Sequence, residues 1–125
     1  MNLQTKEIEM ETLPGRPVRR HVVIYHDRDG ARAVPGCVVV AQGDTVVFES
    51  LTGESVIFLP EMERMARDPV QGAGIIVLPG GQTADFPISE AAEKGVYPYS
   101  VFCTKARRFA IGNSDPTIII RGREG

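Results

Sequence analysis

The stretch from Gly95 to Cys103 most constrains how this chain can fold. Every second residue from Tyr97 to Cys103 falls on one face, which is the period of a β-strand. Aromatic and β-branched side chains suit a half-buried sheet surface. Pro98 cannot donate a hydrogen bond to a neighbouring strand, so a free edge or a bulge is expected there. The stretch predicts a central strand that ends in the loop after Cys103.

Short runs of apolar and β-branched residues, separated by turn residues about every ten positions, fill the rest of the chain. Short helical turns are expected near 61–67 and 89–94, where helix formers lie between proline or glycine stops. This succession predicts an all-β sandwich or barrel. The predicted strands cover 21–25, 37–41, 45–49, 55–59, 74–78, 82–88, 95–103 and 117–121.

Length and composition limit the class of protein. The 125 residues predict a single domain, with residues 1–19 as an amino-terminal strand extension in which charged residues alternate over Thr5–Leu13. A net charge of −2 predicts neither a nucleic-acid nor a membrane partner. We see no signal peptide, which predicts a cytoplasmic protein, or a periplasmic or extracellular one if a leader has been omitted. No catalytic or phosphate-loop motif is found, so we expect no enzyme.

Four pieces of the sequence, taken together, resemble the cupredoxins, the family of blue-copper proteins. They are the strand–Gly-Asp-Thr-Val–strand run at 38–48, the strand at 55–58, the Leu-Pro-Gly-Gly-Gln-Thr hairpin at 78–83 and the Gly-x-Tyr-x-Tyr run at 95–99. The resemblance covers the chain from about Pro35 onward. It implies a Greek-key β-sandwich with a copper site in which two histidines, one cysteine and a weak axial ligand hold the metal.

The residues that would hold copper are missing from this pattern. Ser55 stands where the resemblance places the first histidine, and no histidine follows Ala31. An ungapped match places the ligand cysteine at Val101, whereas a shift of two residues places it at Cys103. The loop at 104–111 supplies neither a second histidine nor a methionine. We therefore expect no cofactor and no type 1 copper site.

The end of the sandwich that would hold copper is our candidate binding end. The function that we predict is a non-enzymatic binding or structural module, whose partner is an unknown protein or a small anionic ligand. A homo-oligomer through Thr5–Leu13 is a further expectation. The candidate residues are Ser55, Cys103, Lys105, Arg107 and Arg108, with Met62 and Met65 in a segment, 62–67, expected to cover that end.

Two alternatives for this end remain open, and both centre on Cys103. One is a redox-active thiol, which requires an exposed sulfur near cations. The other is an atypical copper site that uses Cys103, a methionine and either His21 or His26. These two histidines are five residues apart, which puts them on opposite faces of a strand. A disulfide with Cys37 would require Cα atoms within about 7 Å, and reduced thiols are our expectation.

Overall fold

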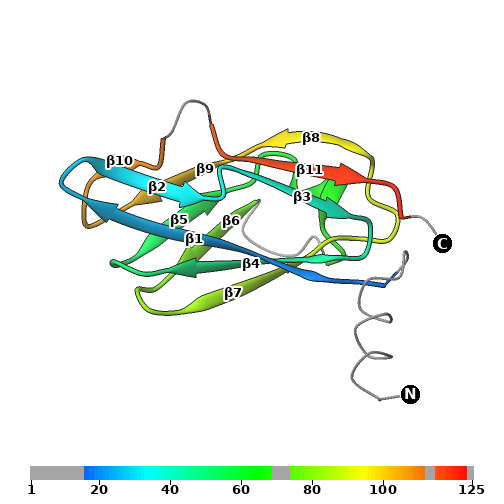
Figure 1. Cartoon of the computed structure of the whole chain (residues 1–125), viewed down its shortest axis with the longest axis horizontal. Helices are drawn as coiled ribbons and strands as arrows, with labels where there is room; N and C mark the ends of the chain where they lie inside the picture. The colour runs from blue at the N-terminus through cyan, green and yellow to red at the C-terminus, as the bar shows by residue number, and fades with distance from the viewer. Residues whose placement is uncertain (1–15, 69–73, 112–114, 124–125) are drawn as a thin grey trace, which may run out of the picture.

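The computed structural model describes residues 16–68, 74–111 and 115–123. These residues form short strands and one helical turn (Figure 1). The elements are β1 (Arg19–Asp27), β2 (Gly30–Val34), β3 (Cys37–Ala41), β4 (Thr45–Ser50), β5 (Ser55–Phe58), α2 (Met62–Met65), β6 (Ile75–Leu78), β7 (Thr83–Pro87), β8 (Gly95–Pro98), β9 (Ser100–Cys103), β10 (Arg108–Phe109) and β11 (Thr117–Arg121).

The strands form three sheets, and the predicted central strand belongs to two of them. The sheet orders are β2-β1-β4-β7, β3-β11-β8 and β10-β9-β5-β6. Strand β8 pairs with β11, and after Tyr99 the chain continues as β9, which pairs with β5. The prediction of one continuous strand over 95–103 was therefore wrong. The break falls directly after Pro98, which has no N–H to donate.

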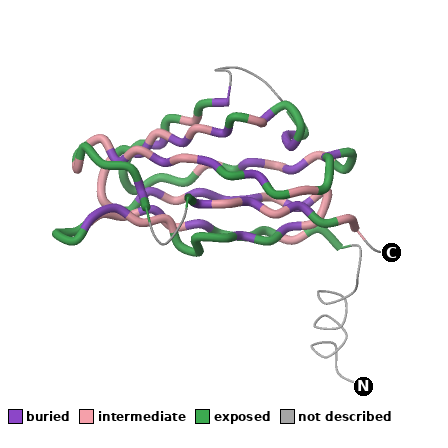
Figure 2. Tube along the Cα trace, turned by 90° about the horizontal axis from the view of Figure 1, so that it is seen from above, coloured by how far each residue is buried: buried purple, intermediate pink, exposed green. Residues whose placement is uncertain are grey.

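The core lies between the first sheet and the two sheets that share the β8–β9 path. Side chains alternate between buried and exposed along most strands, as the tube in Figure 2 shows. The face predicted from Tyr97 to Cys103 is the buried one, which confirms the period-two interpretation. Phe48 crosses the core to pack edge-on against Tyr99, with ring centroids 5.7 Å apart. The sequence prediction of an all-β sandwich is confirmed.

Three local expectations met different outcomes. A turn forms after Asp27, where the Asp27 carboxylate accepts a hydrogen bond from the Asp29 N–H (2.8 Å), and β2 follows where no strand was expected. The helical turn at 62–65 is present. The segment 89–94 holds a single turn, in which the Ala92 N–H donates to the Ser89 carbonyl (3.2 Å), and β8 begins at Gly95.

The proposed strand at Thr5–Leu13 lies outside the described residues, as does most of the predicted extension. In the part of the chain that the structure describes, no helix has the length and apolar character needed to cross a membrane.

Candidate functional site

Strands β5 and β9 meet at the candidate binding end and bring Ser55 opposite Cys103. The two residues are paired in register, and they are 1% and 2% exposed. Ser50, at the end of β4 in the opposing sheet, reaches across so that its Oγ lies 2.7 Å from the Ser55 Oγ. The Ser50 hydroxyl also donates to the carbonyl oxygen of Gly53. A buried hydroxyl pair therefore fills the space beside the thiol.

The direction of these hydrogen bonds determines what Ser55 can offer the thiol. Ser50 has one proton and gives it to the Gly53 carbonyl, so the bond between the two hydroxyls is donated by Ser55. Ser55 therefore offers a thiolate at Cys103 little as a donor. Burial raises the pKa of the Cys103 thiol, and the hydrogen bond with the Ser55 hydroxyl lowers it by a smaller amount. Cys103 is therefore a neutral, shielded thiol at neutral pH, which weakens the redox-thiol hypothesis.

The turn between β4 and β5 is held tightly around this pair. Gly53 adopts a φ of 125°, which side chains rarely tolerate. A Cβ on Gly80 would lie 2.8 Å from the Gly53 Cα, so Gly80 must lack a side chain for the two backbones to approach this closely. Thr52 ties this turn to the neighbouring strand β1. Its Oγ accepts from the His26 backbone N–H at 2.7 Å and lies 2.8 Å from the His26 Nδ1.

The two histidines lie in different places. His26 is at the candidate binding end, where its ring and the Lys105 side chain both approach Gly53. His21 pairs with Val47, near the start of β1, and is exposed on the other face of that strand. Opposite faces were predicted. The chain holds two histidines in all, so this end has one imidazole at most.

The donors at this end do not fit a type 1 copper site. Such a site requires two imidazole nitrogens and a thiolate around the metal. Here one imidazole has its Nδ1 engaged by Thr52, the thiol is neutral, and the remaining neighbours are the Ser50 and Ser55 hydroxyls. Within 16–68, 74–111 and 115–123, no group of three or more His, Cys, Asp or Glu side chains is placed to hold a metal ion.

Cationic side chains gather at this end, beside the exposed carboxylates of Asp27 and Asp29 in the β1–β2 turn. Lys105 lies over Gly53, and Arg107 holds a positive φ of 54° in the turn before β10. The Nη1 atoms of Arg32 and Arg108 lie 3.3 and 3.9 Å from the position that a Cβ on Gly30 would occupy. Two guanidinium groups therefore lie side by side over the β1–β2 turn.

These cations differ from the others in their partners. Arg32 is held in place by backbone carbonyls, since its Nη1 donates to Ala31 (3.0 Å) and Ile111 (2.9 Å). The ion pairs among the described residues lie elsewhere: Arg19–Asp85, Arg64 with Glu61 and Glu93, and Arg123–Asp44. Arg32 was not among the site residues predicted from the sequence. Its only signal was an arginine between two alanines directly after a turn.

Met62 and Met65 do not reach the candidate binding end. The carbonyl of Met65 accepts from the Ser89 N–H (2.8 Å), and Ala66 bridges to Ile88, so α2 packs where β7 ends. That is beside the start of β4, whereas Ser50 is at its end. The expectation that 62–67 covers Cys103 was wrong, because β5 carries the chain along the sheet before α2 begins.

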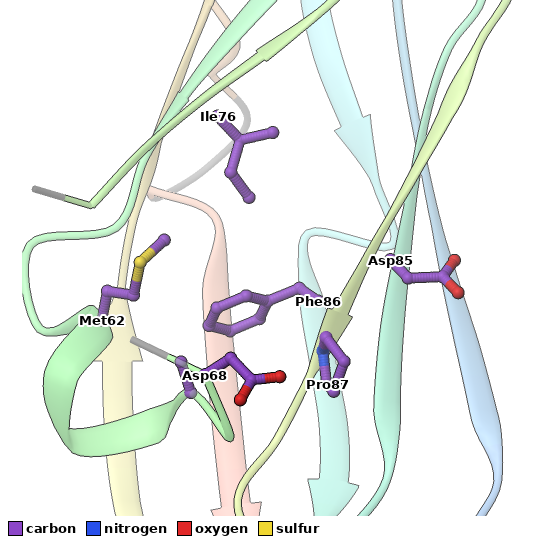
Figure 3. Close-up of a pocket in the computed structure, with 7 residues that line it drawn as sticks. Met62, Asp68, Ile76, Asp85, Phe86 and Pro87 are labelled. Atoms are coloured by element: carbon purple, nitrogen blue, oxygen red, sulfur yellow. The ribbon is translucent and has the colours of Figure 1, made fainter. Parts of the chain in front are cut away.

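A cleft of about 410 Å³ opens beside α2 instead, between the edge strands β6 and β7. Met62, Ile76 and Phe86 point toward one another across it, whereas the Asp85 carboxylate points away, toward its partner Arg19 (Figure 3). Apolar side chains and the Asp68 carboxylate line the cleft together, and the Asp85 carboxylate is already paired with Arg19.

Comparison with solved structures places the fold. The chain is similar to a purple cupredoxin from Nitrosopumilus maritimus (TM-score 0.51, 15% identity, 82% of this chain and 99% of that one). It is also similar to a copper-containing nitrite reductase from Thermus scotoductus SA-01 (TM-score 0.50, 18% identity, 88% of this chain and 29% of that one). No family model matches, and no curated protein matches. The protein is a β-sandwich with the cupredoxin fold.

Proposed function

We propose that this protein is a metal-free, non-enzymatic binding module on the cupredoxin fold, and that it binds an anionic group at the Cys103 end. The observation that carries the proposal is the pairing of Ser55 with Cys103. A hydroxyl stands in register with the thiol and gives its proton to Ser50. A serine hydroxyl, already hydrogen-bonded within the protein, thus occupies the position where a type 1 site would need an imidazole.

The arginine pair supports the choice of an anionic ligand. Two guanidinium groups held close together repel each other unless an anion lies between them. Arg32 is already oriented by two carbonyls, so binding costs it little side-chain entropy. Planar guanidinium groups pair in bidentate fashion with carboxylate or phosphate. The ligand is therefore a carboxylate or phosphate group, on a small molecule or on a partner protein.

We expect inorganic phosphate to bind at this end and to shift the backbone amide signals of Gly30 and Arg32 in a titration followed by NMR. Arg108→Gln and Arg32→Gln should each weaken this binding about tenfold, the value of a charge-assisted hydrogen bond. Arg121→Gln is the matched control, because Arg121 is exposed at the far end of β11. All titrations are compared with chloride at equal ionic strength.

If Arg32→Gln and Arg108→Gln bind phosphate as well as Arg121→Gln does, the anion site is wrong. The absence of any phosphate-specific shift in the wild-type protein would also reject it. Neither result would bear on the copper part of the proposal, which rests on separate residues.

The second candidate is an atypical copper site centred on Cys103, and the position of His26 at the same end favours it. It would require the Cys103 thiol to ionise in a buried place that raises its pKa. Copper titration separates the two candidates, because only the atypical copper site predicts a thiolate-to-copper absorption band.

A further inference from the structure

The outer surface of the sheets that share the β8–β9 path is mostly apolar, and Arg121, exposed at the end of β11, lies at its edge. Antiparallel sheets that face water are ordinarily polar on the solvent side. Here the outward residues form rows across the paired strands. These rows are Cys37·Thr117·Pro98, Val39·Ile119·Val96, Ile75·Phe58·Ser100 and Val77·Val56·Phe102·Phe109, and together we call them the outer face.

The rows are continuous because the alternation never changes phase between Val96 and Cys103. Tyr97, Tyr99 and Val101 point inward, so the residues between them all point outward. Phe109 extends the face at one side, where its ring packs against Phe102 with centroids 5.0 Å apart, yet it stays half exposed. Cys37, Thr117 and Ser100 are the polar members, and all three are small and uncharged.

We infer that the outer face is the interface of a homodimer, in which two copies pack their outer faces together. Each outward residue of a sheet covers roughly 30 Å², so the outer face covers about 400 Å². A stable interface buries about 800 Å² per partner, of which somewhat more than half is apolar. The outer face is therefore about half of the area that a standard dimer buries on each partner, and it would form the centre of such an interface.

The chemistry of the face favours a second copy over a different partner. A two-fold interface brings the same patch against itself, so any charge near its centre would meet its own copy. The outer face has no such charge, and its rows of Val, Ile and Phe can interdigitate as the inner faces of two packed sheets do, about 10 Å apart. Arg32 and Arg108 lie over the β1–β2 turn and are not members of these rows, so a dimer through the outer face leaves the proposed anion site open.

The test is sedimentation equilibrium of the full chain from low micromolar to near-millimolar concentration. Val96→Glu and Val77→Glu are the variants, since these side chains are 62% and 57% exposed and can change without disturbing the core. Leu51→Glu is the matched control, because Leu51 is 52% exposed but lies in the turn after β4, off the outer face. Circular dichroism should show that all three variants fold.

We expect the wild type and Leu51→Glu to be dimeric with the same dissociation constant. Val96→Glu and Val77→Glu should each raise it on the order of a hundredfold, because each places two like charges in a desolvated interface. Alkylation of Cys37 should slow as the wild type dimerises, with little signal from the buried Cys103. A wild-type monomer at near-millimolar concentration, or a dimer unaffected by both face variants, would overturn the inference.

Discussion

Replacement of Asp44 by alanine should lower the free energy of unfolding by about 3–5 kcal/mol, the cost of breaking a buried charged network. Asp44 is 3% exposed in the turn before β4. Its Oδ1 accepts from the Val18 N–H (2.9 Å) and from the Arg123 guanidinium, and its Oδ2 accepts from the Ala41 N–H (2.8 Å). Alanine would leave two backbone donors and a partly buried cation without their acceptor.

The matched control is Asp85→Ala, because Asp85 also pairs with an arginine but does so at the surface. An exposed ion pair contributes about 0–1 kcal/mol, so this variant should unfold close to the wild type in urea. Asp44→Asn should fall between the two, since the amide oxygen keeps one acceptor. Equal stability of Asp44→Ala and Asp85→Ala would show that the turn does not depend on Asp44.

Tyr99→Phe should raise the stability of the protein, by about 1–3 kcal/mol. The Tyr99 hydroxyl is buried, and no hydrogen-bond partner for it exists among the described residues. Removal of a buried hydroxyl without a partner removes its desolvation cost, while the ring still packs against Phe48. Tyr25→Phe is the matched control, because it removes the same hydroxyl from a tyrosine that is only half-buried on β1.

The same hydroxyl predicts a change with pH. Burial, and secondarily the nearby Cys37 sulfur, raises the pKa of Tyr99 above its ordinary value. The free energy of unfolding keeps its full value below the unfolded pKa of about 10. It declines as pH rises from there toward the higher folded pKa, because in that range only the unfolded chain releases the tyrosine proton. The decline is about 1.4 kcal/mol per pH unit.

Urea unfolding at pH 9 and above should therefore show a shallower alkaline loss of stability in Tyr99→Phe than in the wild type. Tyr25→Phe should retain the wild-type slope. A Tyr99→Phe variant that is less stable at neutral pH, or that keeps the full alkaline slope, would mean that the hydroxyl has a partner or is hydrated.

The sequence predicted the fold well where local pattern alone determines structure. The inward face from Tyr97 to Cys103 follows from period two and is observed. The division of that stretch at Tyr99 depends on which strands pair on each side, and those partners come from β5 and β11, far away in the sequence. Strand β2 was missed because Ala-Arg-Ala carries no β-branched signal, and its pairing with β1 alone makes it a strand.

The candidate site was predicted in part. Ser55 and Cys103 were both chosen, and the structure pairs them. Ser50 and Arg32 were not, since each reaches the site from the other sheet, and nothing local to them indicates this. The methionines were misplaced because the direction of β5 decides which end of the sandwich α2 covers. The outer face was not visible in the sequence, since its rows are built from separate strands that each look like ordinary core.

The most direct test of the account is copper titration followed by visible absorbance, with Cys103→Ser as the reference. Blue-copper thiolates absorb intensely at about 600 nm. The thiol here is neutral and buried beside Ser55, and that end has at most one imidazole. We therefore predict no such band. The wild type and Cys103→Ser should give the same spectrum at every copper ratio. An intense band in the wild type that disappears in Cys103→Ser would contradict the account.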